Sequence, residues 1–385
     1  MRDDCQSASD YDARMTESAG PPEAEAGGIL TIDLSAIVAN WRALGARAGN
    51  AACAAVVKAD AYGCGIEPVA GALANAGCRT FFVAHLDEAR RVRAVASDAA
   101  IYVLNGFMPG TGRAYLEADL RPVIVSWPEW DEWSALCAGT SWRGGAALHI
   151  DTGMNRLGFP SSAAAELASR VGNDPGVTLV MSHFACSEEE HPLNAVQIER
   201  FRAIRALFPG IAGSLANSSG IFLGADAHHD LARPGVALYG ANPTPGKPNP
   251  MRPVVGLQGR IVQVRTVEPG ATVGYSATWT AKRPTRIAVV SVGYADGFSR
   301  AASASDARRG AEALIAGQRC PLAGRVSMDL MAIDVTDLAR EVARGDSVTL
   351  LGDGIGVDDL AARAGTISYE VLTNLGRRYR RVYRS

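Results

Sequence analysis

The feature that most constrains the fold of this sequence is a regular alternation of short apolar runs and longer segments from Ile29 to about Leu238. The longer segments, such as 35–49 and 194–208, repeat their apolar residues at helical spacing. Strands that alternate with helices form parallel sheets, and eight of them favour a closed (β/α)8 barrel over an open sheet. The predicted strands are residues 51–57, 80–85, 100–105, 122–126, 146–150, 177–184, 213–217 and 235–240.

A different pattern follows this barrel segment. The proline-rich link at 242–253 leads into segments in which apolar and polar residues alternate with a period of two, which indicates antiparallel strands. We therefore predict an α/β plus β chain, with a (β/α)8 TIM barrel domain over residues 29–250 and a mainly β C-terminal domain over 251–385. Residues 1–28 are acidic and polar and hold too little apolar surface to fold, so we predict a disordered tail.

Composition argues against several classes of partner. The formal net charge is -2 and there is no long run of Lys and Arg, so neither nucleic acid nor a membrane surface is an expected partner. No apolar run approaches the roughly 18 residues of a membrane span, and the first segment lacks the apolar stretch of a signal peptide. The seven cysteines include no C-x-x-C pair, which predicts neither a disulfide framework nor a metal site. We expect a reducing, cytoplasmic location.

Lys58 follows the first predicted barrel strand, in AVVKADAYGCG. A lysine is usually a surface residue with a buried stem, but catalytic groups gather where barrel strands end. A partly desolvated amine there loses proton affinity and can attack a carbonyl to form a Schiff base. Gly63 and Gly65 suggest a dinucleotide-binding loop, but Pro68 stands where its third glycine belongs. Pyridoxal phosphate is the cofactor whose attachment matches such a lysine.

The lysine segment resembles the cofactor-lysine signature of the alanine racemases. Further segments resemble the same family in order, and together they cover essentially everything from about Ile29 onward. The resemblance implies a cytoplasmic homodimer with shared active sites, which interconverts L-alanine and D-alanine through a pyridoxal phosphate aldimine and supplies D-alanine for peptidoglycan. The other matching segments are residues 149–159, 182–190, 216–220, 232–240, 273–279, 292–300, 324–335 and 366–371.

The resemblance implies two proton-transfer groups on opposite faces of the substrate, because a proton removed from one face must return on the other. Lys58 is the implied Schiff-base lysine and the first group, and Tyr275 of the other subunit is the second. Without its motif, Tyr275 would be interpreted as a buried strand tyrosine. A tyrosine with a pKa of about 10 is a poor base near neutral pH. His183 is implied to hydrogen-bond it, although a lone histidine is more often a core residue.

Further roles follow from the same resemblance. Arg233 is implied to face the pyridine nitrogen, which must then stay an unprotonated acceptor because arginine only donates. The phosphate would approach the backbone closely at Gly235, and the substrate carboxylate would meet Arg156 and the backbone N–H of Met328, with Tyr294 near the entrance. The implied cofactor-binding residues are Lys58, Tyr62, Asn217, Ser218, Arg233, Gly235, Val236 and Tyr369, and the substrate-binding residues are Arg156, Met328 and Tyr294.

One position departs from the family pattern. The family often has a lysine two residues before the aspartate of the arginine motif, and its carbamylated side chain holds the arginine. This sequence has His149 there. Because imidazole forms no equivalent stable carbamate, Arg156 must be oriented by a neutral nitrogen of His149, a bound anion or another group.

Other interpretations remain open. A broader racemase that also accepts serine would carry the same motifs. A barrel-only cofactor carrier would not need Tyr275 and Met328 in a second domain. A decarboxylase of the same barrel class would carry a second-domain cysteine and aspartate in its own motif, whereas Cys320 precedes a string that fits the racemases. A barrel enzyme without pyridoxal phosphate is possible on fold alone.

Overall fold

The computed structural model describes residues 19–140, 145–172 and 176–385. These residues form two compact units, which we call the barrel unit and the β unit. The barrel unit consists of Ile37–Leu238 and Asn242–Met251, and the β unit consists of the described residues up to Ala36 together with Tyr239–Ala241 and Arg252–Ser385.

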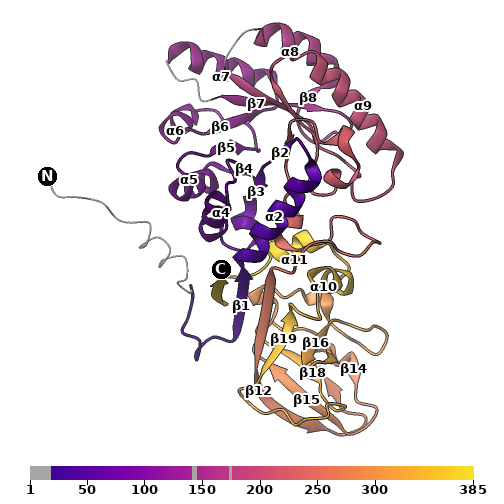
Figure 1. Ribbon diagram of the computed structural model, residues 1–385. Helices are drawn as coiled ribbons and strands as arrows, with labels where there is room; N and C mark the ends of the chain where they lie inside the picture. Colours follow the sequence, from indigo (N-terminus) through magenta and orange to yellow (C-terminus); the bar gives the residue numbers. More distant parts are fainter. Residues whose placement is uncertain (1–18, 141–144, 173–175) are drawn as a thin grey trace, which may run out of the picture. The chain divides into compact units, whose positions relative to one another are not determined.

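The barrel unit contains parallel strands that alternate with helices (Figure 1). Most of the strand residues are apolar and buried, as expected for strands that are covered on both faces. This arrangement confirms the predicted parallel barrel. Hydrogen bonds connect, in order, β3 (Ala55–Val56), β4 (Thr80–Val83), β5 (Ala100–Val103), β6 (Arg121–Ile124), β7 (Ala146–Asp151), β9 (Val177–Met181) and β10 (Ala212–Ser214).

A short strand, β11 (Leu231–Ala232), closes the ring. It pairs in parallel with β2 (Ala52–Cys53), which directly precedes β3. On its other side, the Arg233 N–H donates to the Ala216 carbonyl at 2.9 Å. The strand predicted at 235–240 is therefore wrong: Val236–Tyr239 form a 3-10 helix. The parallel hydrogen bonds run as far as Pro234, whose carbonyl accepts from the Val56 N–H at 3.0 Å although the proline has no N–H to donate.

Helices cover the outside of the barrel, and several of them do so with an apolar stripe. In α8 (Ala164–Val171), for example, the buried residues are spaced three and four apart, at Ala164, Leu167 and Val171. The other barrel helices are α2 (Leu34–Ala48), α4 (Ile66–Asn75), α5 (Leu86–Val95), α6 (Gly112–Glu117), α7 (Trp127–Gly139) and α9 (Pro192–Ala206).

The β unit confirms the predicted mainly β C-terminal domain. Its long strand β12 (Val255–Val267) pairs antiparallel with three other strands. The remaining elements of the unit's larger sheet are β1 (Gly28–Asp33), β15 (Thr285–Val290), β16 (Glu312–Ile315), β17 (Gln318–Pro321), β18 (Met331–Asp334), β19 (Ser347–Leu351) and β20 (Arg380–Arg384), and the helices are α10 (Val357–Ala364) and α11 (Ser368–Thr373).

The first predicted domain limit is wrong. The barrel does not begin at Ile29, because β1 belongs to the β unit, where it lies between β12 and β20. Its residues alternate between buried and half-buried, the pattern of a strand in a sheet with one covered face. Residues 1–18 of the predicted tail lie outside the described residues. The prediction is wrong for 19–28, because Ala19 exchanges two backbone hydrogen bonds with Arg381, at 3.1 and 2.7 Å, and Ala26 is buried.

Candidate active site

The barrel unit carries most of the predicted site residues on segments that follow the carboxyl ends of its strands. These ends lie on one face of a parallel barrel, so the segments converge there. The structure thus brings together residues that are as much as 178 positions apart. Strand β3 is followed by Lys58 and Tyr62, β7 by Arg156, β9 by His183, β10 by Asn217 and Ser218, and β11 by Arg233, Gly235 and Val236.

A left-handed turn follows Lys58. Four successive residues, Ala59 to Tyr62, have positive φ angles of 55, 54, 53 and 52°. Residues with a Cβ rarely adopt this conformation, so the surroundings must hold it. Within the turn, the N–H of Ala61 donates to the carbonyl of Val57 at 2.9 Å, and that of Gly63 to Ala59 at 2.8 Å. Lys58 therefore stands at the start of a constrained backbone segment.

The local environment lowers the pKa of the Lys58 amine. Burial is the main cause, because it disfavours the charged form, and the positive charge of Arg156 adds to it. Glu88 acts in the opposite direction. More of the amine is therefore neutral near physiological pH than for a lysine in water.

Arg233 is the buried centre of the site, with 3% of its surface exposed. Its Nη2 donates to the Ser182 carbonyl at 2.6 Å and lies 3.4 Å from His183 Nδ1, and its Nη1 donates to the Ser214 hydroxyl. Burial lowers its pKa to about 9, so the guanidinium is still protonated at neutral pH. Arginine has no acceptor, so His183 Nδ1 accepts and its Nε2 carries the proton.

Two histidines lie near Arg233, the buried His149 and the half-buried His183, and both are neutral at pH 7. The pKa of His149 is lowered to about 4, and that of His183 lies well below 6.5. In both cases burial is the main cause, and the positive charge of Arg233 is the second. Because Nδ1 of the neutral His183 already accepts a hydrogen bond, the ring can make one further hydrogen bond, as a donor from Nε2.

The hydroxyl of Ser218 lies in a cradle of backbone N–H groups. Its Oγ accepts from the N–H of Gly235 at 2.9 Å and of Ala237 at 3.2 Å, which leaves the hydroxyl proton free to donate. A Cβ on Gly235 would collide with the hydroxyl of Tyr62. Asn217 supports the same loop, because its Oδ1 accepts from the Gly220 N–H at 2.8 Å. Such convergent donors suit an anionic group.

Arg156 lies exposed on the loop after β7. Asp151 shapes this loop by accepting backbone N–H groups, including that of Met154 at 2.9 Å. Within the described ranges, Arg156 forms no ion pair with a carboxylate and no hydrogen bond with His149. Instead the His149 ring packs against Gly158, where an added Cβ would lie 2.8 Å from the ring Cδ2.

The β unit holds the remaining predicted residues. Tyr275, Met328 and Tyr294 are 66%, 53% and 41% exposed, so Tyr275 is not the buried strand tyrosine that its sequence alone would suggest. The Tyr294 N–H donates to Ser327 at 3.0 Å, and the Met328 carbonyl accepts from the next N–H, which brings these two segments together. Tyr369 lies on α11.

Sequence reasoning missed a buried polar network behind His183. The fully buried Gln197 donates to Thr152 Oγ1 at 3.0 Å and to the His183 carbonyl at 2.9 Å, and it accepts from the Ala185 N–H at 2.9 Å. The Thr152 hydroxyl contacts that of Ser182 at 2.8 Å. A glutamine on the apolar face of the helical segment at 194–208 was the available signal.

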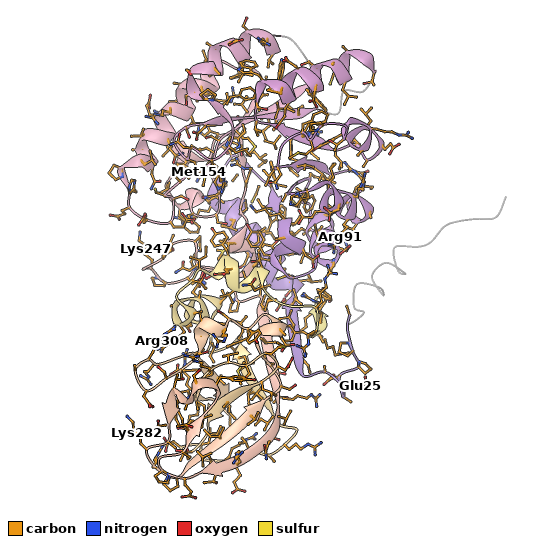
Figure 2. The ribbon with its side chains drawn as sticks, turned by 180° about the vertical axis from the view of Figure 1, so that it is seen from behind. Glu25, Arg91, Met154, Lys247, Lys282 and Arg308 are labelled. Carbon is orange, nitrogen blue, oxygen red and sulfur yellow. The ribbon has the colours of Figure 1, made fainter. Side chains whose placement is uncertain are left out.

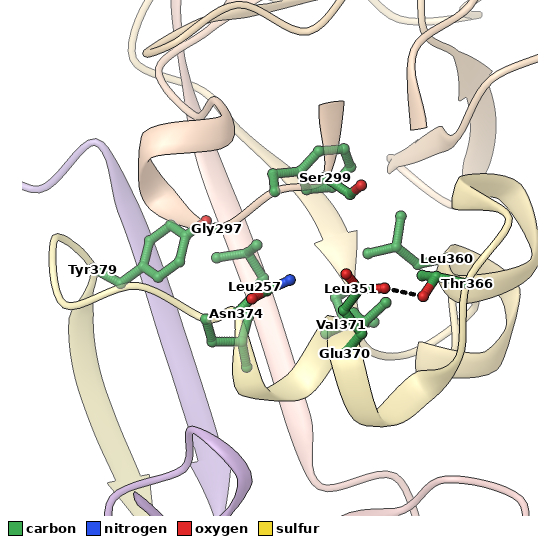
Figure 3. Close-up of a pocket in the computed structure, with 12 residues that line it drawn as sticks. Leu257, Gly297, Ser299, Leu351, Leu360, Thr366, Glu370, Val371, Asn374 and Tyr379 are labelled. Atoms are coloured by element: carbon green, nitrogen blue, oxygen red, sulfur yellow. Dashed lines mark hydrogen bonds between the residues drawn. The ribbon is translucent and has the colours of Figure 1, made fainter. Parts of the chain in front are cut away.

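A hollow of about 410 Å³, open to solvent, lies within the β unit (Figure 3). Its lining is mainly apolar, for example Leu257, Leu351 and Val371, and includes a hydrogen bond from Thr366 to Glu370. No predicted site residue lines it.

Two kinds of feature are absent from the described part of the chain. No helix there is long and apolar enough to cross a membrane. Nor do three or more His, Cys, Asp or Glu side chains gather there in a group that could hold a metal ion.

Comparison with known proteins covers nearly the whole chain. Family models described as "Alanine racemase, N-terminal domain" and "Alanine racemase, C-terminal domain" match residues 32–243 and 254–383. The alanine racemase of Methylobacterium sp. (strain 4-46) is 53% identical to this chain, over 93% of this chain and 98% of its own length. The alanine racemase of Methylobacterium nodulans is 54% identical, over 93% of this chain and 96% of its own length. The crystal structure of alanine racemase from Bartonella henselae with covalently bound pyridoxal phosphate has a TM-score of 0.87, at 38% identity over 93% of this chain and 99% of that one.

Proposed function

The chain belongs to the alanine racemase family, and from that premise we propose which of its residues bind pyridoxal phosphate and interconvert L-alanine and D-alanine. Bound pyridoxal phosphate supplies an electron sink that makes the α proton of an attached amino acid easier to remove. The observation that carries the assignment is the position of Lys58. It is half-buried with a lowered pKa at the carboxyl end of a barrel strand, whereas the other two lysines in the sequence, Lys247 and Lys282, are exposed (Figure 2).

The cradle around Ser218 fits the cofactor phosphate. The Ser218 hydroxyl can donate, Gly235 leaves room for close approach, and Tyr62 adds a second hydroxyl beside Gly235. We include the backbone of Val236, the loop residue Asn217 and the hydroxyl of Tyr369 in this binding set.

Arg233 and His183 are assigned to the pyridine side of the cofactor. A guanidinium only donates, so the ring nitrogen facing it would remain unprotonated and withdraw electrons less strongly. The expected consequence is fewer protons returned to the wrong carbon. His183 Nε2 would donate to the phenolic oxygen of Tyr275 and make this tyrosine a better base.

The two proton-transfer groups are assigned to Lys58 and to Tyr275 of a second copy of the chain. A dimer with shared sites explains why the β unit exposes Tyr275, Tyr294 and Met328, three large side chains that would otherwise contact water. Arg156, which has no carboxylate partner among the described residues, would bind the substrate carboxylate together with the N–H of Met328, and Tyr294 would line the entrance.

We place the enzyme in the cytoplasm and propose that it supplies D-alanine for peptidoglycan. The described cysteines support the location, because no disulfide forms among Cys53, Cys64, Cys78, Cys137, Cys186 and Cys320.

Reduction of the loaded enzyme with borohydride tests the role of Lys58. Mass spectrometry should find the reduced cofactor on the peptide that contains Lys58. Lys58→Ala should lower racemisation by about three orders of magnitude or more, because it removes both cofactor attachment and a proton-transfer group. Lys247→Ala and Lys282→Ala are matched controls that should retain full labelling and activity. Labelling of either exposed lysine instead of Lys58 would refute the assignment.

His149 predicts an enzyme that does not depend on carbon dioxide. The family's lysine can be carbamylated at its amine, and this chain has no amine at that position. Enzyme kept degassed and free of bicarbonate should therefore retain full activity. His149→Lys restores the amine and serves as the comparison in which added bicarbonate can act. Activation of the wild-type enzyme by bicarbonate would contradict the prediction. His149→Ala should mainly raise KM through a misplaced Arg156, because the His149 ring packs against Gly158 on the loop that carries this arginine.

A further inference from the structure

Glu88 is a buried carboxylate that binds backbone N–H groups. It lies in the first turn of α5 and is 7% exposed. Its Oε1 accepts from the Ala59 N–H at 2.6 Å, and its Oε2 accepts from the N–H groups of Ala84 at 2.8 Å and His85 at 3.2 Å. These donors and the positive end of the helix dipole compensate the buried charge. Glu88 therefore ties the carboxyl end of β4 to the segment after β3.

The bond to Ala59 reaches the residue directly after Lys58, where the left-handed turn begins. Helix α5 holds the same turn a second time, because Arg91 Nη2 donates to Asp60 Oδ1 at 2.6 Å. Figure 2 labels Arg91 on this helix. Ala59 and Asp60, two consecutive residues in an unfavourable backbone conformation, are thus both hydrogen-bonded to α5.

We propose that Glu88 is a positioning residue for Lys58, because its carboxylate fixes the backbone on which the amine stands. The proposal rests on the role assigned to Lys58 in the racemase reaction. Without the bond to Glu88, the Ala59 N–H loses its acceptor and the turn can relax toward ordinary dihedral angles, which moves Lys58. Displacements of about 1 Å at a reacting group can reduce rates by about a hundredfold.

Glu88→Gln separates this role from helix capping. Gln has the same size but only one acceptor oxygen, and its NH2 group would face an N–H donor. If the oxygen keeps its two donors at Ala84 and His85, the NH2 group is directed at Ala59. The start of α5 then remains capped while the anchor of the Lys58 turn is lost.

Glu129 provides a matched control in the same barrel. It lies in the first turn of α7, and its Oε2 accepts from the N–H groups of Val125, at the end of β6, and Phe107, in the loop after β5, both at 3.1 Å. Like Glu88, it ties two strand-end segments to the start of a barrel helix, but no lysine stands at the anchored loop, and one oxygen accepts both donors. Glu129→Gln therefore removes the same charge while its one acceptor oxygen can keep both donors, and it should leave proton transfer alone.

The experiment compares α-proton exchange in deuterated water, starting from D-alanine or from L-alanine, for loaded wild-type, Glu88→Gln and Glu129→Gln enzymes. The resemblance to the alanine racemases implies that Lys58 acts on the D face of the substrate, so Glu88→Gln should slow exchange from D-alanine by about tenfold or more. Exchange from L-alanine should stay within about twofold. Glu129→Gln should leave the ratio of the two rates at its wild-type value even if its melting temperature falls.

Borohydride labelling of the same samples keeps two failures apart. If the wild-type enzyme is not labelled on Lys58, the proposed function fails, whatever Glu88 does. If Lys58 is labelled and Glu88→Gln leaves the exchange ratio unchanged, or shifts it no more than Glu129→Gln does, the positioning role is overturned. Should Glu88→Gln not fold, Glu88→Asp retains the charge and the helix cap but is one methylene too short to reach Ala59. Exchange from D-alanine should slow in the same way, and an unchanged ratio of the D-alanine and L-alanine exchange rates would again overturn the proposal.

Discussion

Replacing Tyr275 by phenylalanine should abolish racemisation in both directions. The substitution removes one hydroxyl and retains the ring, so the protein fold and the barrel part of the site should be unaffected. Both directions fail together because the equilibrium constant between the enantiomers is fixed by symmetry near unity. Loss of a proton-transfer group typically lowers rates by about 10² to 10⁴. Conversion of either enantiomer, followed by polarimetry or a chiral separation, measures the effect.

In Tyr275→Phe, exchange of the α proton should survive for one enantiomer only. With Lys58 intact and assigned to the D face, Tyr275→Phe should still exchange the α proton of D-alanine with deuterated water. L-alanine should exchange far more slowly, because its proton leaves toward the missing hydroxyl. Proton NMR of each enantiomer reports the two rates separately. Equal residual rates for both enantiomers would contradict the two-base assignment.

The exposure of Tyr275 shows where sequence reasoning needs more than hydrophobicity. An aromatic residue near a short apolar run is usually interpreted as buried, yet Tyr275 is 66% exposed in this chain. Only the family motif indicated a special role. The spacing of apolar residues reflects contacts within one chain, so it does not indicate a side chain that would contact a second copy.

The parallel strands were predictable because burial on both faces gives continuous apolar runs. The segment at 80–85, for example, contains β4 with its bounds at Thr80 and Val83. β1 was misassigned because its partners in β12 and β20 are more than 220 positions away. The run at 235–240 looks like a strand, but Val236–Tyr239 form a 3-10 helix directly after Pro234, which has no N–H to donate to a strand partner.

Within the candidate site, the residues to which we assign contacts with a ligand stand in motifs, whereas the residues that bind backbone groups do not. Arg233 and His183 stand in recognisable segments and lie within 3.4 Å of each other. Glu88 and Gln197 bind mainly N–H and carbonyl groups, whose positions depend on the completed barrel. A carboxylate at the third position of a helix is common in a capping box, and the sequence does not show that Glu88 also reaches Ala59.

Activity should return when two inactive variants, Lys58→Ala and Tyr275→Ala, are refolded together. In the proposed dimer, each of two equivalent sites takes Lys58 from one chain and Tyr275 from the other. A mixed dimer then has one site with both lesions and one site with none. Random reassortment makes about half of the dimers mixed, so activity should reach roughly a quarter of the wild-type value. Each variant refolded alone gives the baseline.

A reciprocal mixture tests the same model with activity falling instead of rising. When wild-type chains are refolded with an equal amount of the Lys58→Ala/Tyr275→Ala double variant, every site of a mixed dimer carries one lesion if the sites are shared. Without subunit exchange the mixture would have about half of the activity of an all-wild-type sample, because half of its chains are wild type. With exchange and shared sites, the activity should drop to about a quarter. If each chain used its own Tyr275, mixed dimers would retain one working site, activity would stay at about a half, and the two single variants would restore nothing. Mass measurement of the mixed dimers under native conditions makes both results interpretable, because a shared site requires recovery in the first mixture and loss in the second.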